Sequence, residues 1–287
     1  MEARILDGRA LAAELRAGLT ARVAVLHARG VAPRLLVIMV GEDESSLAYV
    51  RGMKSLGTKI GVEVVVEVLA PASSEPAVSA ALERAAENDD VHGVILQQPL
   101  PRHLSIRNIA SAVPESKDVD GTNPINQGRL AFAMGTRFVP ATPAAVMLLL
   151  ERSAAWPLRG KNVVVVGRSS VVGLPVALLV LAQNATVTIV HRETREIAAR
   201  VRAADVVIVA TGRPHMVDAA WIRPGATVID VGTTVVDGKL RGDVDFESVR
   251  AVAAEITPVP GGVGPVTNVA LMRNVVTAAE CAAELVA

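Results

Sequence analysis

Apolar residues recur along this chain with two spacings, one typical of helices and one typical of strands. Residues 6–28 are rich in alanine, leucine and arginine, with apolar positions at helical spacing, and they predict a long amphipathic helix. Gly30 and Pro33 would end it. Further on, short apolar or β-branched runs alternate with longer helical segments. The predicted strands are 34–40, 62–69, 91–96, 162–166, 186–190, 205–210 and 226–231. The predicted helices between and after them are 45–60, 75–87, 142–152, a segment from Gly173, 194–204 and a terminal helix from Thr267.

This alternation predicts an α/β fold with mostly parallel sheets covered by helices. The chain has 287 residues, which exceeds one typical domain and fits two, each with its own core. Functional residues in such sheets collect at the carboxyl ends of the strands. The chemistry is therefore expected in the loops that follow the predicted strands.

Residues 161–182 predict a strand, a tight turn and a helix, which is how a nucleotide-binding βαβ unit begins. Gly167 and Gly173 would let backbone approach a phosphate near the start of a helix, whose N-terminal N–H groups are unpaired. The usual Gly-x-Gly-x-x-Gly spacing is not met, since Ser169 and Val172 occupy the positions where glycines would stand. An α/β turn without a ligand would have a similar sequence, so the motif alone leaves both interpretations open.

The next predicted strand, 186–190, ends in His191 and Arg192 rather than in an acid. NAD-binding units carry an Asp or Glu there, which holds the ribose hydroxyls. Arg192, with Arg168 in the preceding turn, would instead bind a 2′-phosphate through charge-assisted hydrogen bonds. NADP is therefore favoured over NAD, although either arginine alone is equally compatible with a solvated loop.

Composition excludes several classes of protein. Lys and Arg number 29 and Asp and Glu also number 29, so no polyanionic partner such as a nucleic acid is indicated. The longest stretch without a polar residue, 171–182, is too short to span a membrane, and the N-terminus does not resemble a signal peptide, which predicts a cytoplasmic protein. Cys281 is the only cysteine and the five histidines have no ligand spacing, so no metal is expected.

Polar residues follow the first predicted strands at three places: 41–43, 97–99 and 117–121. Tyr49, the only tyrosine, lies on the helix after the first of these places, although a single tyrosine is more often a core residue. Gln97 precedes Pro-Leu-Pro, so its amide can point into a cleft. Asp118 and Asp120 can serve a ligand or close a turn by bonding their own backbone.

Two later loops also resemble ligand-binding loops. Residues 211–214 (Thr-Gly-Arg-Pro) follow the predicted strand 205–210. This strand would be the third of a Rossmann half, and the loop after it would contact the cofactor. Residues 256–266 contain three prolines and three glycines, and we expect a rigid loop whose backbone lies close to a ligand.

Taken together, the motifs resemble one specific family. VGEDESSLAYV, ILQQPLP, KDVDG, GRSSVVG, VATGRP, DVG, GKLRGDV and TPVPGGVGPVT occur in the order and at the spacing of the bifunctional methylenetetrahydrofolate dehydrogenase/methenyltetrahydrofolate cyclohydrolases. The resemblance covers nearly the whole chain. It implies a folate-binding catalytic domain at 1–141 joined by the C-terminal helix 268–287, a Rossmann NADP-binding domain at 142–267, and a homodimer.

The resemblance also implies roles for individual residues. Catalytic roles fall on Tyr49, Gln97 and Asp120. The predicted cofactor-binding set is Gly167, Arg168, Ser169, Gly173, Arg192, Gly212 and Thr233. The predicted substrate-binding set is Tyr49, Gln97, Pro99, Asp120, Gly261, Gly262 and Pro265. Asp120 would accept hydrogen bonds from the amino and ring N–H groups of the pterin, a role that suits a carboxylate.

One position departs from the family pattern. The family motif places a lysine four residues after the tyrosine, and this chain has Met53 there. Positions 49 and 53 differ by only about 40° around a helix, whereas Lys54 lies about 100° further round and is not an automatic substitute. The implied activity is NADP-dependent oxidation of 5,10-methylenetetrahydrofolate, within one-carbon metabolism and purine biosynthesis, with a weakened cyclohydrolase step to 10-formyltetrahydrofolate.

Two other functions remain open at this point. The replaced lysine is compatible with a non-catalytic NADP- or folate-binding partner of the same fold. A different two-domain NADP dehydrogenase, of the amino-acid or shikimate type, is the third hypothesis, and the KDVDG and PGGVGP stretches argue against it.

Overall fold

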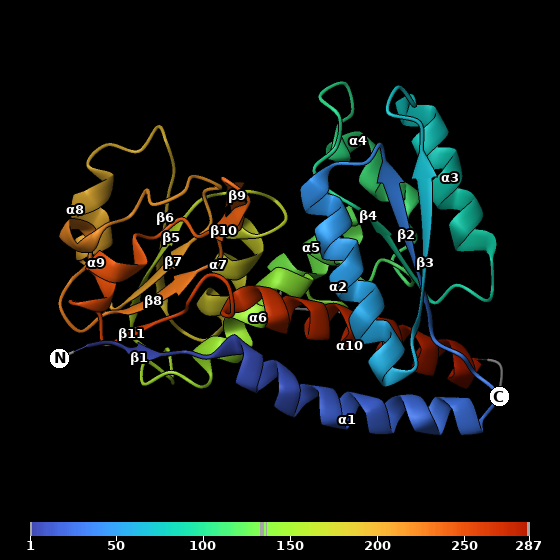
Figure 1. The fold of residues 1–287 in the computed structure, drawn as a ribbon, viewed down its shortest axis with the longest axis horizontal. Helices are drawn as coiled ribbons and strands as arrows, with labels where there is room; N and C mark the ends of the chain where they lie inside the picture. The colour runs from blue at the N-terminus through green and yellow to red at the C-terminus, as the bar shows by residue number, and fades with distance from the viewer. Residues whose placement is uncertain (1, 133–134, 136, 286–287) are drawn as a thin grey trace. The chain divides into compact units, whose positions relative to one another are not determined.

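The computed structural model describes residues 2–132, 135 and 137–285, and the chain forms two compact units (Figure 1). The six-stranded unit comprises the residues up to Ala13 together with Thr142–Thr267. The three-stranded unit comprises Glu14–Ala141 and the residues from Asn268 onward. Helices α1 (Gly8–Ala28) and α10 (Val263–Leu285) each contribute residues to both units.

The first residues of the chain group differently from the predicted domain boundary, which assigned them to the folate-binding domain. Strand β1 (Arg4–Ile5) pairs in parallel with β11 (Glu255–Ile256) of the six-stranded unit. The buried Glu255 carboxylate also forms an ion pair with Arg4, so both backbone and side chain tie the N-terminal segment to this sheet.

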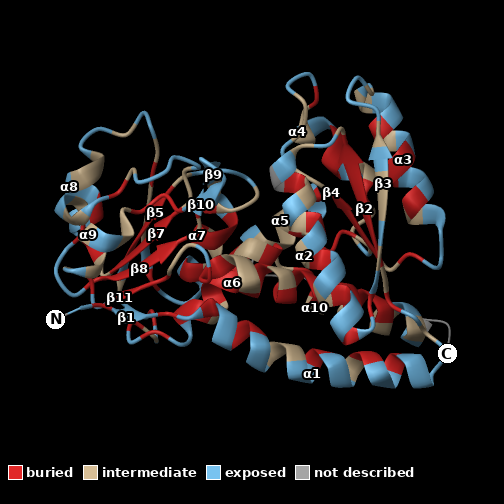
Figure 2. Ribbon diagram, viewed as in Figure 1, coloured by how far each residue is buried: buried red, intermediate tan, exposed pale blue. Residues whose placement is uncertain are grey.

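The six-stranded sheet is entirely parallel and has the order β1-β11-β8-β7-β5-β6. Its other strands are β5 (Asn162–Val166), β6 (Thr186–Val190), β7 (Val206–Val209) and β8 (Thr227–Asp230). Strands β7 and β8 are buried along their whole length (Figure 2), as their continuous β-branched runs predict for inner strands of a parallel sheet. The predicted α/β fold with parallel sheets is confirmed.

The helices of this unit are α6 (Ala141–Leu150), α7 (Gly173–Ala182), α8 (Ile197–Arg202), α9 (Phe246–Arg250) and the 3-10 turn η2 (Ala219–Trp221). An antiparallel hairpin, β9 (Thr234–Val236) and β10 (Lys239–Arg241), had not been predicted. Helix α8 is shorter than the predicted 194–204 because Glu196 adopts a left-handed conformation with φ of 54°. Helix α6 begins at Ala141, so Thr142 lies inside the helix rather than capping it.

The three-stranded sheet has the order β3-β2-β4 and is also parallel. Its strands are β2 (Arg34–Val40), β3 (Glu63–Leu69) and β4 (Gly93–Leu96), and its helices are α2 (Glu44–Ile60), α3 (Glu75–Glu87), α4 (Ile106–Ile109), α5 (Pro124–Ala131) and the 3-10 turn η1 (Ala110–Ala112). One face of this sheet packs on α3, whose Leu82 is fully buried among Ile38 and Val94. This arrangement places the residues after β2 and β4 at one edge of the sheet.

The glycine- and proline-rich segment is shorter than predicted. Helix α10 begins at Val263 rather than at Thr267, so Gly264 and Pro265 lie in its first turn. Proline is favoured in a first turn, where its missing N–H has no intrahelical partner to lose. The predicted rigid loop therefore reduces to the residues before Val263.

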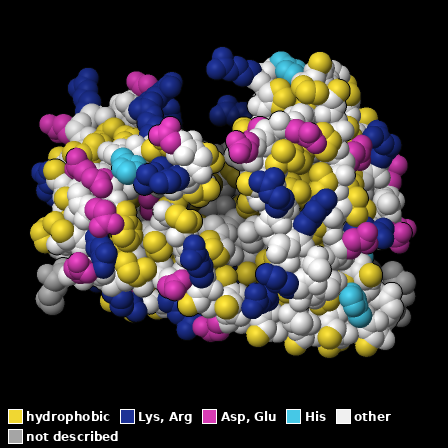
Figure 3. Space-filling view, viewed as in Figure 1, with side chains coloured by type: hydrophobic (Ala, Val, Ile, Leu, Met, Phe, Trp, Pro, Cys, Tyr) yellow, Lys and Arg dark blue, Asp and Glu magenta, His cyan; other side chains and the backbone are white. Residues whose placement is uncertain are grey.

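Charges of both signs are interspersed over the face drawn in Figure 3, in keeping with the balanced composition. Among the described helices, none is long and apolar enough to cross a membrane.

Candidate nucleotide and folate sites

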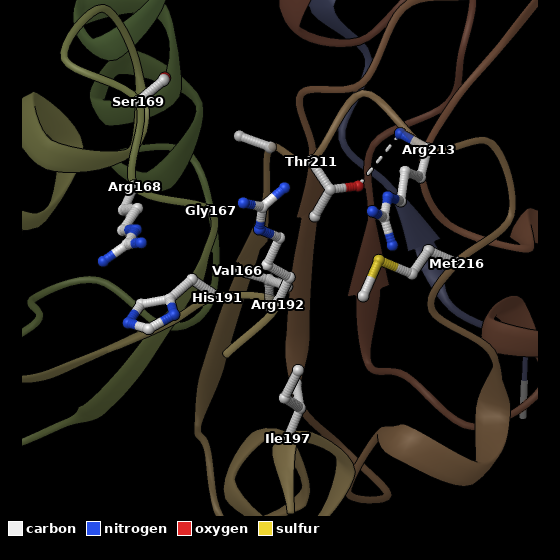
Figure 4. A pocket seen from close by; sticks show the side chains of 11 residues that line it. Val166, Gly167, Arg168, Ser169, His191, Arg192, Ile197, Thr211, Arg213 and Met216 are labelled. Carbon is white, nitrogen blue, oxygen red and sulfur yellow. Dashed lines mark hydrogen bonds between the residues drawn. The ribbon is translucent and has the colours of Figure 1, made fainter. Parts of the chain in front are cut away.

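A pocket of 410 Å³ opens at the carboxyl ends of β5, β6 and β7 in the six-stranded unit (Figure 4). Strand β5 lies between β6 and β7, so the chain leaves β5 toward one side of the sheet and later returns to the other. Such a reversal opens a crevice, which is where α/β sheets bind nucleotides. The pocket is lined by Val166, Gly167, Arg168, Ser169, His191, Arg192, Ile197, Ala210, Thr211, Arg213 and Met216.

Two glycines allow close backbone packing beside this pocket. Gly167 has φ of 127°, and a Cβ added there would lie 2.1 Å from the carbonyl oxygen of Ala210. A Cβ added at Gly173 would lie 2.4 Å from the carbonyl oxygen of Gly167. No other residue fits either position, because both contacts are with backbone. The turn therefore keeps the first and last glycines of a nucleotide-binding loop at a different spacing.

The start of α7 differs from the prediction. The Ser169 hydroxyl accepts hydrogen bonds from the N–H groups of Val172 (3.1 Å) and Gly173 (3.4 Å). These two N–H groups are therefore not unpaired, and the predicted role of the helix start as an open phosphate site is wrong for them. Ser169 itself remains at the pocket wall, where its hydroxyl proton is free to be donated elsewhere.

Three arginines surround the pocket, one from each of the loops after β5, β6 and β7 (Figure 4). Arg168 and Arg192 belong to the predicted cofactor set, whereas Arg213 does not. All three are exposed, and Arg192 contacts Glu193 at 3.1 Å. The loop 211–214 had been predicted to meet the cofactor, but only its Gly212 was included in the predicted cofactor set. Its position after a strand could have identified Arg213 as well. A cationic ring of this kind fits a polyphosphate ligand.

Besides Gly173, two further members of the predicted cofactor set do not line the pocket. Thr233 is exposed, just before β9. Gly212 lies between the lining residues Thr211 and Arg213 and has φ of 67°. It therefore allows the loop to adopt its conformation but does not itself form part of the pocket wall.

Two buried carboxyl groups, Asp243 and Asp230, hold backbone segments next to the pocket through hydrogen bonds. Asp243 is fully buried, and its Oδ2 accepts hydrogen bonds from the N–H groups of Thr211 (2.5 Å) and Gly212 (2.9 Å). Asp230 accepts from the N–H groups of Asp243 (3.0 Å) and Val244 (3.0 Å). Burial and the charge of Asp243 raise the pKa of Asp230 to about 7, against the effect of these donors. The DVG and GDV motifs therefore hold the pocket loop, a role the sequence had not revealed.

The predicted catalytic residues lie in the three-stranded unit. Gln97 directly follows β4, Tyr49 lies on α2, and Asp120 lies in the segment that follows the isolated bridge between Val94 and Asp118. All three catalytic candidates are half-buried. The Nε2 group of Gln97 donates to the carbonyl oxygen of Gln98 at 2.6 Å, and the neighbouring Pro99 is exposed.

The pKa values of both Tyr49 and Asp120 are raised, and Asp120 contributes to the shift of Tyr49. Burial raises the pKa of Tyr49 well above its usual value, and the charge of Asp120 raises it further. Burial also raises the pKa of Asp120 to about 7, with a further contribution from Asp118, while the N–H of Ala141 lowers it. These two groups therefore lie within electrostatic reach of each other. Shifted pKa values of this kind concentrate at functional sites.

The segment that carries Asp120 is held in place by Asp118, for which turn closure was one of the two predicted interpretations, and by Asn274, which was not predicted. Asp118 accepts hydrogen bonds from the N–H groups of Thr122 (2.9 Å) and Asn123 (2.8 Å), which fixes the turn. From α10, the Nδ2 group of Asn274 donates to the carbonyl oxygens of Val119 and Val139, both at 2.8 Å. Asp120 is thus presented by a rigid backbone.

The remaining predicted substrate residues belong to the six-stranded unit. Gly261 and Gly262 are buried, Gly261 has φ of 114°, and Pro265 is half-buried in the first turn of α10. A Cβ added at Gly262 would lie 2.6 Å from the carbonyl oxygen of Pro258, so this backbone is tightly folded. Within the described residues, no group of three or more His, Cys, Asp or Glu side chains could hold a metal ion.

The fold and the pocket define a two-unit α/β protein with a nucleotide-binding half. Comparisons with known proteins identify its family. Residues 140–283 match the model of the tetrahydrofolate dehydrogenase/cyclohydrolase NAD(P)-binding domain, and residues 6–120 match the model of the catalytic domain of the same family. The chain therefore belongs to the tetrahydrofolate dehydrogenase/cyclohydrolase family.

Relatives and solved structures agree with this assignment. The chain is 47% identical over 276 residues to the bifunctional protein FolD of Parafrankia sp. (strain EAN1pec), covering 96% of this chain and 99% of that protein. The methylenetetrahydrofolate dehydrogenase-cyclohydrolase of Trypanosoma brucei, complexed with NADP cofactor and inhibitor, superposes with a TM-score of 0.93 at 40% identity and 98% coverage of both chains. The bifunctional FolD of Campylobacter jejuni superposes with a TM-score of 0.92 at 36% identity, covering 97% of this chain and 99% of that one.

Proposed function

We propose that this chain is an NADP-dependent methylenetetrahydrofolate dehydrogenase that also hydrolyses the methenyl product to 10-formyltetrahydrofolate. The observation that carries the proposal is the arginine-ringed pocket at the carboxyl ends of β5, β6 and β7, in a chain of the tetrahydrofolate dehydrogenase/cyclohydrolase family. Family membership leaves no support for the amino-acid or shikimate type of dehydrogenase.

The pocket fits NADP better than NAD. From the loop after β6, Arg192 lines the pocket, whereas the acid of that loop, Glu193, does not. Arg168 and Arg213 from the neighbouring loops add positive charge for the phosphates. The absence of a Cβ at Gly167 lets the backbone stay close to the ligand. The bound cofactor would supply the acceptor for a hydride.

The oxidation requires alignment of the substrate and little acid–base chemistry. Loss of a hydride from the methylene carbon leaves a methenyl cation, so no proton has to be moved in this step. We infer that Asp120 accepts hydrogen bonds from the pterin and that Tyr49 and Gln97 orient the one-carbon unit. The backbone hydrogen bonds around Asp118 and Asn274 fix the position of Asp120 and so support this alignment.

The cyclohydrolase step is proposed to be the weaker of the two activities. Met53 stands where the family motif has a lysine, and its side chain is fully buried and has no proton to transfer. Lys54 is exposed and points to a different side of α2. Among the described residues of α2, position 53 therefore offers no amine beside Tyr49.

The test is to measure both activities on the purified protein. We expect NADP reduction with 5,10-methylenetetrahydrofolate, a slower reaction with NAD, and slow hydrolysis of the methenyl compound that increases in the Met53→Lys variant. Binding of NADPH without any turnover would favour a non-catalytic binding partner instead. Inactivity with both cofactors would contradict the dehydrogenase, and efficient wild-type hydrolysis that is lost in Lys54→Ala would contradict the helical-face argument.

The homodimer, the cytoplasmic location and the role in purine biosynthesis that the resemblance implies stay predictions. Exposed Leu174 and Leu181 on α7 are compatible with a subunit contact.

A further inference from the structure

The side chain of Asn268, in α10, contains a polar atom that makes no hydrogen bond within the described residues. Its Oδ1 is buried, and among the described residues no group donates a hydrogen bond to it. Asn268 lies in the three-stranded unit, a few residues after the first turn of α10. An unsatisfied buried acceptor is destabilising and calls for an explanation. A hydrogen-bond donor on a bound ligand or on a water molecule would explain this acceptor.

Helix α2 makes room for this amide. A Cβ added at Gly52 would lie 3.1 Å from Nδ2 of Asn268, which would push the amide away by a few tenths of an ångström. Gly52 lies in the interior of α2, where glycine is normally unfavourable. The glycine and the asparagine are therefore matched in space, and the glycine lets the amide lie directly against the helix.

This contact lies on the Tyr49 side of α2. Tyr49 and Gly52 are three residues apart, so they differ by about 60° around the helix and share a face. The protonation of Tyr49 responds to the charge of Asp120, and Asn274 on the same helix as Asn268 holds the carbonyl next to Asp120. The amide of Asn268 therefore lies against the face of α2 that carries Tyr49.

The side chains next to Gly52 on α2 do not offer a polar group at this place. Met53 is fully buried, and Arg51 and Lys54 are exposed. A carboxamide can accept a hydrogen bond from a water O–H and donate two of its own, but it cannot take up a proton. It can therefore orient a nucleophilic water without acting as a base.

We propose that Asn268 is a positioning residue for hydrolysis of the methenyl group, with its Oδ1 accepting a hydrogen bond from the attacking water. This inference rests on the proposed function. In the first step the water oxygen bonds to the methenyl carbon and one proton leaves to solvent, giving a neutral carbinolamine. The C–N5 bond then breaks as the hydroxyl oxygen forms the carbonyl, and N5 keeps the electron pair and takes the hydroxyl proton. A neutral amide that orients water without removing its proton accounts for a hydrolysis step that is present but slow.

The experiment compares two activities in the same set of variants. In Asn268→Leu we expect kcat for methenyltetrahydrofolate hydrolysis to fall roughly tenfold or more, because the water is no longer oriented. The dehydrogenase kcat should stay within about twofold, because hydride transfer does not use that water. Asn268→Asp keeps an acceptor oxygen and should retain most of the hydrolysis. Gly52→Ala keeps the amide but displaces it, so a smaller selective loss is expected.

A matched control is Gly18→Ala, since Gly18 also lies within a helix and a Cβ there meets nothing within 4 Å. It should leave both activities unchanged. The inference is overturned if Asn268→Leu and Gly52→Ala leave hydrolysis unchanged, if they reduce both activities equally, or if the wild type does not hydrolyse the methenyl compound above the uncatalysed rate. Absence of dehydrogenase activity in the wild type would instead contradict the proposed function itself. If Asn268→Leu does not fold, Asn268→Asp and Gly52→Ala still decide the matter.

Discussion

The two candidate sites of this chain differ in their electrostatics. The pocket of the six-stranded unit presents three exposed arginines, and Asp243 fixes the backbone of the loop that carries Arg213. The Tyr49 side of the three-stranded unit presents half-buried groups whose pKa values are raised. Guanidinium groups offer planar sets of donors for charge-assisted hydrogen bonds, which suits the first site to phosphate groups. Burial makes the charge of the second site depend on pH. Three perturbations test this difference.

The largest effect is expected from removing the support beneath the arginine pocket. Asp243→Ala would remove the acceptor of the N–H groups of half-buried Thr211 and exposed Gly212, which costs about 0.5–1.5 kcal/mol for each hydrogen bond. We expect a lower melting temperature and, because the loop that carries Arg213 loses its anchor, a marked rise in the KM for NADP. Thermal unfolding and steady-state kinetics measure both.

Asp243→Asn is the informative companion, because its amide oxygen can still accept from both N–H groups. It should retain most of the cofactor affinity. A loss of stability in Asp243→Ala with an unchanged KM for NADP would show that the carboxylate supports the fold alone and not the pocket.

A smaller effect is expected from removing one pocket charge. Arg192→Ala should weaken NADP much more than NAD, since loss of a charge-assisted hydrogen bond is worth roughly 1.5 to 3 kcal/mol, or about tenfold or more in affinity. Dissociation constants for both cofactors measure the difference. Arg195→Ala is a matched control, because Arg195 is exposed but does not line the pocket. Equal losses for NADP and NAD would remove Arg192 from the 2′-phosphate.

Much of this contrast could be predicted from the sequence, and the reason is local. Strands β2, β5 and β6 begin and end at the predicted residues, because their β-branched runs are bounded by glycine, proline or polar residues. Arg168 and Arg192 were found because a loop that directly follows a strand has a predictable place.

What the sequence did not reveal depends on residues far apart in the chain. Strands β1 and β11 are two residues each, too short for any periodicity, and they pair across about the whole length of the chain. Asp243 binds the loop at Thr211 across 32 positions of sequence, and no pattern in the sequence around Asp243 predicts that contact. The contact between Asn268 and Gly52 is likewise invisible until the two helices are seen together.

The smallest effect is expected from pH, and it is predicted here for the candidate catalytic residues of the three-stranded unit. The pKa of Asp120 is raised to about 7, so its carboxylate becomes protonated as the pH falls through 7 and then loses its charge and part of its ability to accept hydrogen bonds. The KM for methylenetetrahydrofolate should therefore rise severalfold, up to about tenfold, between pH 8 and pH 6. Asp120→Asn has no titrating group and should bind weakly but with a flat profile over the same interval. An unchanged pH dependence in Asp120→Asn would show that another group titrates, and a flat wild-type profile would show that Asp120 is ionised throughout. Either result would remove the pH-dependent charge that distinguishes this site from the arginine pocket.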